Sequence, residues 1–166
     1  MKKSNILFCI ALFVILFFTA CGQNSKQSEE ITWATTNVGA NIPDGYGNYY
    51  TWEEAKTACP KGLRLPTINE LENLLDEENV TFEWTTLNGI GGRKFDNGSN
   101  TIFLPASGGC RFVSYGTIED VGTSGYYWSI TERCNYNAYG LYFSRGLAYL
   151  LNYDKASRFS VRCVAE

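Results

Sequence analysis

The sequence contains no histidine. This absence excludes Ser-His-Asp and Cys-His catalytic arrangements, a histidine general base and histidine-ligated zinc. Enzymes can work without histidine, for example with a pair of carboxylates, but no spacing of Asp or Glu in this chain favours such a pair. We therefore predict that the protein is not an enzyme and that it carries no cofactor.

An excess of basic residues is also missing. Lys and Arg number 14 against 17 Asp and Glu, which gives a formal net charge of −3. Removal of residues 1–20 would take away Lys2 and Lys3, leaving twelve basic residues against seventeen acidic ones and a net charge of −5. Binding to nucleic acid depends on neutralising phosphates, so we expect no nucleic-acid partner.

The only long apolar run lies at the N-terminus. Lys2 and Lys3 precede an uncharged run over residues 6–18, and the small residues Thr19 and Ala20 follow it. The run is shorter than the ~20 apolar residues that a transmembrane helix needs. This order of positive, apolar and small residues predicts a secretory signal peptide over residues 1–20.

The stretch Phe18-Thr19-Ala20-Cys21 resembles the processing site of bacterial lipoprotein precursors. The resemblance implies a diacylglycerol on Cys21, cleavage before it and further acylation, for example by palmitate. Several acyl chains suffice for stable membrane attachment. We expect a lipid anchor to the cell envelope, at the outer membrane, with the cell surface as one place of display. An ordinary signal peptide that leaves Cys21 as a thiol, and an uncleaved anchor, are the alternatives.

The mature chain divides into a tether and one domain. Residues 22–30 are polar and lack a large apolar side chain, which predicts a flexible tether over residues 21–30. Glu29 and Glu30 fit either a surface-export signal or a solvated linker. Residues 31–166 have the length of a single domain.

Four cysteines remain once Cys9 leaves with the signal peptide and Cys21 is lipidated: Cys59, Cys110, Cys134 and Cys163. An even number in an exported chain indicates two disulfides, and the sequence leaves all three pairings open. A four-cysteine zinc site is the alternative, but it requires close C-x2-C pairs, which this sequence does not have.

Two capping boxes, Thr51-x-x-Glu54 and Thr67-x-x-Glu70, predict two helices. Their apolar stripes are Trp52, Ala55 and Cys59 in the first, which ends at Pro60, and Ile68, Leu71, Leu74 and Leu75 in the second. The acidic residues between 70 and 78 are interpreted as a solvated face.

Short apolar and aromatic runs between turn residues predict strands after residue 79. These runs are 102–104, 126–128, 141–143, 148–151 and 158–163, the last with alternating apolar and polar residues that direct Cys163 inward. Helices followed by strands indicate an α+β domain.

Several stretches together resemble the Fibrobacter succinogenes major paralogous domain family. They are residues 33–39 (WATTNVG), 49–55 (YYTWEEA), 59–67 (CPKGLRLPT), 88–95, 102–108 (IFLPASG), 127–129 (YWS) and 159–164 (FSVRCV). The resemblance implies a C-type-lectin-like fold, with two helices packed on a short-stranded antiparallel sheet with long loops, and with adjacent termini. It also implies that Cys59 on the first helix pairs with Cys163 on the last strand, and by remainder that Cys110 pairs with Cys134.

The motifs of calcium-dependent lectins are missing from this chain. Neither Glu-Pro-Asn, Gln-Pro-Asp nor Trp-Asn-Asp occurs, and Asn152-Tyr153-Asp154 is the nearest sequence. Asp96 and Asn100 could offer oxygen ligands to calcium, but runs of Asn, Asp and Gly are mostly turns. We therefore predict no metal site and interpret residues 96–100 as a turn.

Aromatic residues are the remaining binding feature. Exposed aromatic rings stack on sugars or on peptide side chains, and the candidates are Tyr136, Tyr139, Tyr153 and Trp128. We expect Tyr136 and Tyr139 to be exposed. The predicted function is a non-catalytic, lipid-anchored envelope protein whose domain binds a glycan or a protein. The alternatives are a structural or assembly component of the envelope or a surface appendage without a small ligand, and an oxidase of the formylglycine-generating type, which needs reactive cysteines. The oligomeric state does not follow from the sequence.

Overall fold

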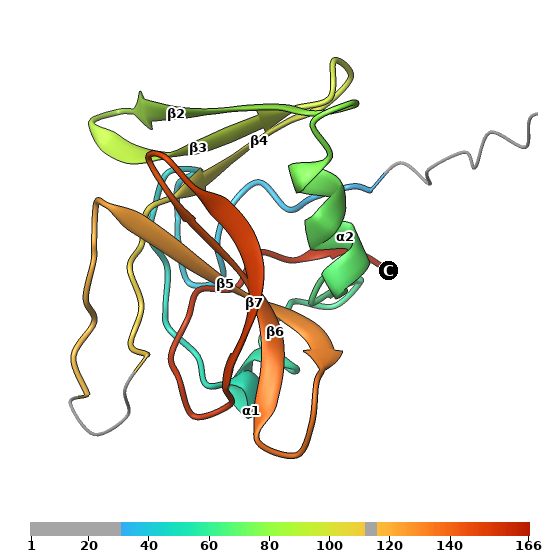
Figure 1. Cartoon of the computed structure of the whole chain (residues 1–166), viewed down its shortest axis with the longest axis vertical. Coiled ribbons are helices and arrows are strands. Elements are labelled where there is room, and N and C mark those ends of the chain that lie inside the picture. The colour runs from blue at the N-terminus through green and yellow to red at the C-terminus, as the bar shows by residue number, and fades with distance from the viewer. Residues whose placement is uncertain (1–30, 112–115) are drawn as a thin grey trace, which may run out of the picture.

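Antiparallel strands form most of the regular structure in the computed structural model, which describes residues 31–111 and 116–166 (Figure 1). In order along the chain, the elements are α1 (Trp52–Ala55), β1 (Leu63–Arg64), α2 (Ile68–Glu72), the 3-10 helix η1 (Asn73–Leu75), β2 (Thr81–Leu87), β3 (Ile90–Asp96), β4 (Thr101–Pro105), β5 (Ser124–Glu132), β6 (Asn137–Ser144), β7 (Ala148–Asp154) and β8 (Val164–Ala165). The predicted signal peptide, the lipidation site Cys21 and the tether lie outside the described residues.

The predicted fold class is wrong. Within the described residues, eight strands form three antiparallel sheets, in the orders β1-β8, β2-β3-β4 and β5-β6-β7, and the two α-helices span four and five residues. The domain is therefore a β-rich sandwich and not an α+β domain with two helices packed on a sheet. The C-type-lectin-like fold implied by the resemblance is not confirmed.

Both predicted helices begin where the capping boxes place them, but they are short. Thr51 and Glu54 exchange the two hydrogen bonds of the box at α1. After Ala55, the amide of Ala58 bonds back only three residues, to Ala55. Cys59 then leaves the helix for its disulfide, so it does not lie on the helix as predicted. Pro60 has no amide hydrogen to continue helical bonding.

The second helix is extended by η1 rather than by further α-helical turns. Leu71 of α2 and Leu74 of η1 are buried, as the apolar stripe predicts. The backbone becomes extended at Asp76. Of the acidic residues that were interpreted as a solvated face, Glu72, Glu77 and Glu78 are exposed. Glu70 instead accepts a hydrogen bond from the backbone amide of Thr67.

Four of the predicted runs are strands, within β4, β5, β6 and β7. The prediction missed the β2–β3 hairpin, whose turn residues Asn88 and Gly89 have φ angles of 50° and 87°, as a tight hairpin turn requires. The last predicted strand, 158–163, consists of isolated bridges at Arg158, Phe159 and Ser160, with β8 beginning only at Val164.

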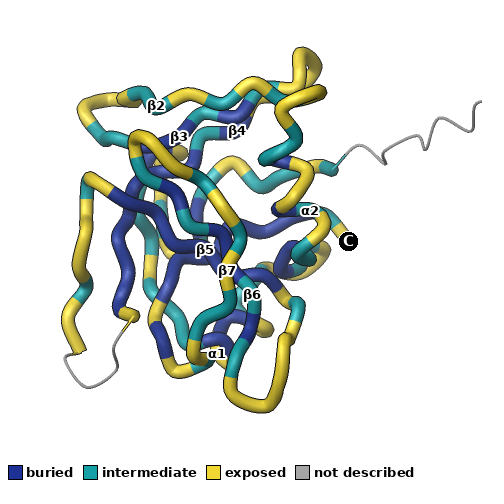
Figure 2. Tube along the Cα trace, viewed as in Figure 1, coloured by how far each residue is buried: buried dark blue, intermediate teal, exposed yellow. Residues whose placement is uncertain are grey.

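The sheet β5-β6-β7 lies between two hydrophobic clusters (Figure 2). On one face Tyr126 and Trp128 pack with α1 and with the returning segment Phe159–Val161. On the other face Tyr127, Leu141 and Phe143 pack with α2 and with the sheet β2-β3-β4. Phe95 of β3 meets Phe143 of β6 edge to face, with ring centroids 6.4 Å apart. The strands far apart in sequence are thereby joined into one core.

The two ends of the described domain are adjacent, as the resemblance implies (Figure 1). Trp33 forms an antiparallel bridge with Val164, and the amide of Ala34 donates to the carbonyl of Cys163 at 2.9 Å. Cys163 is joined to Cys59 by a disulfide that closes a separation of 104 residues, which is the first of the two pairings that the resemblance implied. Over residues 31–111 and 116–166, no helix is long and apolar enough to cross a membrane.

Candidate functional site

An aromatic surface lies on the outer part of the sheet β5-β6-β7. It consists of Tyr126 on β5, Tyr142 on β6, and Tyr149, Leu151 and Tyr153 on β7. Tyr142 is paired in register with Tyr126 on one side and with Tyr149 on the other. Side chains two residues apart in a strand share a face, so Leu151 and Tyr153 lie on the same face as Tyr149.

The rings of the aromatic surface contact one another in a row. The centroids of Tyr126 and Tyr142 are 5.0 Å apart, and those of Tyr142 and Tyr149 are 4.9 Å apart with an interplanar angle of 33°. Tyr126 is buried at the inner end, whereas Tyr149 and Leu151 are 38% and 43% exposed at the outer end. The row therefore leads from the core to the solvent.

Polar groups border the buried end of this surface. The hydroxyl of Tyr126 donates to Asp120 Oδ2 at 3.1 Å, and Arg111 lies 3.7 Å from the same carboxylate oxygen. The guanidinium carbon of Arg111 is 5.6 Å from the Tyr126 ring centroid. Burial raises the pKa of Tyr126 and of Tyr153, so both phenols keep their protons and can donate hydrogen bonds.

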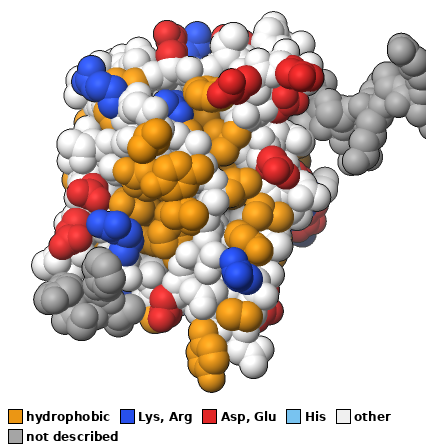
Figure 3. Space-filling view, in the orientation of Figure 1, with side chains coloured by type: hydrophobic (Ala, Val, Ile, Leu, Met, Phe, Trp, Pro, Cys, Tyr) orange, Lys and Arg blue, Asp and Glu red, His pale blue; other side chains and the backbone are white. Residues whose placement is uncertain are grey.

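In space-filling view, a continuous hydrophobic area occupies the centre of the face that carries β5 and β7 (Figure 3). Basic and acidic side chains stand at its margin rather than within it. An apolar area bordered by charges is typical of a binding surface.

The structure excludes Trp128 from this site. Its side chain is 0% exposed, its ring lies 4.5 Å from that of Phe159, and its indole N–H donates to the carbonyl of Tyr50 at 2.8 Å. Trp128 is a core residue with a satisfied donor, so it cannot contact a ligand. The prediction of Trp128 as a binding residue is wrong.

The other three candidates lie in different places. Tyr136 is 77% exposed at the β5–β6 turn, as expected, but it is outside the aromatic surface. Tyr139 is half-buried and not exposed as expected, because it lies within β6, on the opposite face of that strand from Tyr142. Tyr153 is half-buried within the aromatic surface, with its ring 6.0 Å from Tyr126.

Sequence reasoning missed the pair Tyr142 and Tyr149 as a site. Both belong to runs that were predicted as strands, and a short turn separates them. Two strands joined by a short turn form a hairpin. Counting outward from residues 144–147 would have placed Tyr142 opposite Tyr149, which is the register that the structure has.

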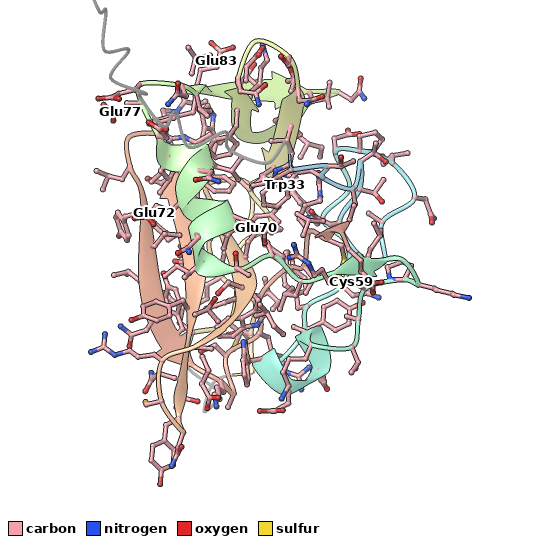
Figure 4. All side chains as sticks on the ribbon, turned by 90° about the vertical axis from the view of Figure 1, so that its right-hand side faces the viewer. Trp33, Cys59, Glu70, Glu72, Glu77 and Glu83 are labelled. Atoms are coloured by element: carbon pink, nitrogen blue, oxygen red, sulfur yellow. A yellow bond between two sulfur atoms is a disulfide. The ribbon has the colours of Figure 1, made fainter. Side chains whose placement is uncertain are left out.

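A groove of about 740 Å³ lies between η1 and the β3–β4 turn. Trp33, Glu70, Asp76 and Asp96 are among its lining residues. Figure 4 shows Trp33 and Glu70 on this side of α2. Asp76 accepts a hydrogen bond from the amide of Glu78 at 3.1 Å, and Glu70 accepts from the amide of Thr67 at 2.7 Å. These carboxylates stabilise the local backbone, so the groove is the weaker candidate.

Residues 96–100 form a turn, as predicted. Asp96 Oδ1 accepts from the amide of Gly98 at 2.9 Å, and Asn97 Oδ1 accepts from the amide of Asn100 at 2.7 Å. These hydrogen bonds and that of Thr101 lower the pKa of Asp96. No cluster of three or more His, Cys, Asp or Glu that could bind a metal occurs in the part of the chain that the structure describes.

The second predicted disulfide is not present. Cys134 is an exposed thiol in the β5–β6 turn, and its Sγ lies 3.7 Å from Asn137 Oδ1. Cys110 is buried, and its backbone exchanges hydrogen bonds of 2.9 and 2.8 Å with that of Arg158. An even number of cysteines therefore did not dictate complete pairing. Two disulfides would have left no thiol for an oxidase of the formylglycine-generating type, but Cys134 is an exposed thiol, so the cysteines do not argue against that alternative.

The geometry defines a β-rich domain with one disulfide within the described residues and an aromatic surface on its central sheet. The family model of the Fibrobacter succinogenes major domain matches residues 19–165, and the chain belongs to this family. No curated protein matches the chain. No solved structure matches it either.

Proposed function

We propose that this chain is a lipid-anchored, non-catalytic envelope protein that binds a glycan through the aromatic surface. The observation that supports this proposal is the pair of half-buried Tyr142 and exposed Tyr149, whose ring centroids lie 4.9 Å apart on the face of the sheet that also carries the exposed Leu151. A pair buried in the core could not contact a ligand, whereas the ring of Tyr149 in this pair is exposed to solvent.

The chemistry of the surface fits a sugar. A pyranose ring has an apolar face that stacks on an aromatic ring, and hydroxyls at its edge that need donors and acceptors. The tyrosine rings offer a stacking surface for the apolar face of the sugar. The phenol groups, together with Asp120 and Arg111, offer donors and acceptors for its hydroxyls. Ser124 Oγ adds a hydroxyl 3.4 Å from that of Tyr142.

The sequence supports the anchor and the absence of catalysis. Positive, apolar and small residues precede Cys21 in the order of a lipoprotein leader. The absence of histidine removes the commonest general base from the whole chain. Anchoring through Cys21 at the outer membrane would display the domain to extracytoplasmic glycans.

A glycan array with the purified mature protein tests the binding proposal. Tyr149→Ala removes the exposed ring and is expected to weaken binding about two- to tenfold through lost stacking alone, since an aromatic contact contributes about 0.5–1.5 kcal/mol beyond area burial. Tyr136→Ala is the matched control, because Tyr136 is more exposed but lies outside the aromatic surface.

The proposal fails if no glycan binds, or if Tyr136→Ala abolishes binding while Tyr149→Ala does not. Silence across glycans together with a defined envelope protein crosslinked at Tyr149 would favour the envelope-assembly role instead. Metabolic labelling with an alkyne fatty acid tests the anchor separately, because Cys21→Ser should abolish incorporation of the label.

A further inference from the structure

Arg93 is a buried cation on the inner face of β3. It is 5% exposed, and its Nη2 donates a long hydrogen bond of 3.4 Å to the carbonyl of Arg145. Its Nε and Nη1 have no hydrogen-bond partner among the described residues. Burial lowers the pKa of this guanidinium, because removal from water disfavours the charged form.

The surroundings of Arg93 are aromatic. The register of β2 and β3 places Arg93 opposite Trp84, and the guanidinium carbon of Arg93 lies 5.0 Å from the ring centroid of Phe82. Rings of this kind attract a cation through their faces but do not satisfy its N–H donors. The hydrogen bonds of Nε and Nη1 must therefore come from another group.

A second arginine stands beside the first. Arg145 is exposed in the β6–β7 turn, and its guanidinium carbon lies 5.6 Å from the Trp84 ring centroid. In the described part of the chain, no carboxylate oxygen lies within 4.0 Å of either guanidinium, since the ion pairs found there involve Lys56, Arg64, Lys94, Arg111 and Lys155. Both arginines therefore neighbour Trp84, and neither has a carboxylate partner among the described residues.

An unpaired buried charge is costly, and exchange for an apolar residue of similar volume is often stabilising. Figure 3 shows basic side chains next to hydrophobic ones on the upper part of the drawn face, where Figure 1 has β2 and β3. Because Nε and Nη1 of Arg93 are themselves buried, an anion would reach them only after the side chains beside the β6–β7 turn shift, and it would then offer the missing acceptors.

We propose that Arg93 and Arg145, framed by Trp84 and Phe82, bind an oxyanion of the carboxylate or sulfate class. Guanidinium groups form charge-assisted hydrogen bonds to such groups. The oxyanion is either a free inorganic anion or the charged group of an acidic sugar. This inference does not rest on glycan binding at the aromatic surface, because it uses other residues and another pair of strands.

The test is an NMR titration of the ¹⁵N-labelled mature protein with sodium sulfate and, separately, with glucuronate. The Nε–Hε resonance of Arg93, assigned by its loss in Arg93→Met, is expected to shift with saturation. Sodium chloride at equal ionic strength is expected to give no saturable shift. Tighter binding of glucuronate than of sulfate would identify an acidic sugar as the source, and the reverse would identify a free anion.

Two variants separate binding from folding. Arg145 is exposed, so Arg145→Met should fold normally and weaken sulfate binding at least about tenfold, the effect of losing one charge-assisted hydrogen bond. Arg133→Met, at an exposed arginine in the β5–β6 turn, is the matched control and should bind as the parent does. The proposal is overturned if sulfate and glucuronate both fail to shift Arg93, if chloride shifts it equally, or if Arg145→Met binds unchanged.

Discussion

Arg162 and Asn37, 125 residues apart in the sequence, meet in the interior, where Arg162 Nε donates to Asn37 Oδ1 at 3.0 Å. Asn37 Nδ2 in turn donates to the hydroxyl of Tyr127 at 3.0 Å, and that hydroxyl donates to the carbonyl of Pro105 at 2.7 Å. Burial raises the pKa of Tyr127 to about 12. All four residues belong to the stretches that carry the family resemblance, so these stretches build one buried polar network.

Substitution of Asn37 should disrupt this network. Asn37→Ala leaves Arg162 Nε, a buried charged donor, without its acceptor, and we expect a loss of about 3 kcal/mol in the free energy of unfolding. Urea denaturation measures this loss. Asn48→Ala, at an exposed position, should change stability by less than about 0.5 kcal/mol. Equal effects of the two variants would show that the network contributes nothing.

The disulfide between Cys59 and Cys163 should contribute most through the unfolded state. Closing a separation of 104 residues restricts the unfolded chain by about 4.7 kcal/mol in the chain-entropy model. The double variant Cys59→Ala, Cys163→Ala should therefore unfold at a much lower temperature. Cys134→Ser should leave the melting temperature unchanged. In the folded, unreduced parent, the exposed thiol of Cys134 should be the group that a thiol reagent labels. A melting temperature that is insensitive to loss of the disulfide would contradict this account.

Gly125 of β5 should not tolerate a side chain. A Cβ at this position would overlap the ring of Phe143, which is itself fixed in the core. We expect Gly125→Ala to cost about 2–3 kcal/mol through overpacking. Gly146→Ala, where a Cβ would have no neighbour within 4 Å, is the matched control for calorimetry and should be nearly neutral. A neutral Gly125→Ala would mean that the ring of Phe143 can move aside.

Glu70 should make stability depend on acid pH. Hydrogen bonds from the Arg64 side chain, with further ones from Thr67, lower the pKa of Glu70 from its ordinary 4.5 to about 2. Since the pKa is lower in the folded chain, this stabilisation is complete above about pH 5 and is lost as the pH falls through 2. Arg64 is 41% exposed, so solvent screening reduces the contribution to about 1–2 kcal/mol.

Glu70→Gln keeps the capping geometry and removes the charge. At pH 7 the variant should be less stable than the parent by that amount, and the difference should disappear as the pH falls below about 2. Urea unfolding at a series of pH values gives both curves. Glu72→Gln, at an exposed neighbour, should follow the parent at every pH. Parallel curves for Glu70→Gln and the parent would refute the assignment.

Local signals in the sequence predicted the starts of both helices and four of the strands, because these depend on neighbouring residues. The capping boxes at Thr51 and Thr67 are both formed. The lengths of the helices depend on distant partners, since Cys59 is drawn away by Cys163 from the other end of the chain. The prediction of the fold class was wrong because the helices are shorter than expected and because the β2–β3 hairpin, with its turn at Asn88 and Gly89, was not predicted.

The prediction of the site failed mainly because the sequence does not show which side chains are buried, whereas most of the predicted strands were assigned correctly. Trp128 has the residue type of a binding side chain, but the segment around Phe159 returns to cover it. The alternation around Ser160 and Arg162 predicted an outward polar face, yet both residues are buried, because the segment lies inside the fold. From the sequence, Arg93 has the residue type of an exposed surface cation. It is buried because the sheet β2-β3-β4 packs against the sheet β5-β6-β7.

The position of the disulfide also determines how the domain would respond to mechanical force between its ends. The strand pairing of Trp33 with Val164 is antiparallel at the ends of the domain, so a pull on both ends would open it like a zipper, one hydrogen bond at a time. Extension would then stop where Cys59 and Cys163 transmit the load through a covalent bond. The 104-residue span between them, which contains the aromatic surface and both arginines of the proposed oxyanion site, would carry no tension. If the domain is tethered through Cys21 as proposed, its aromatic surface would stay intact while the attachment is under strain.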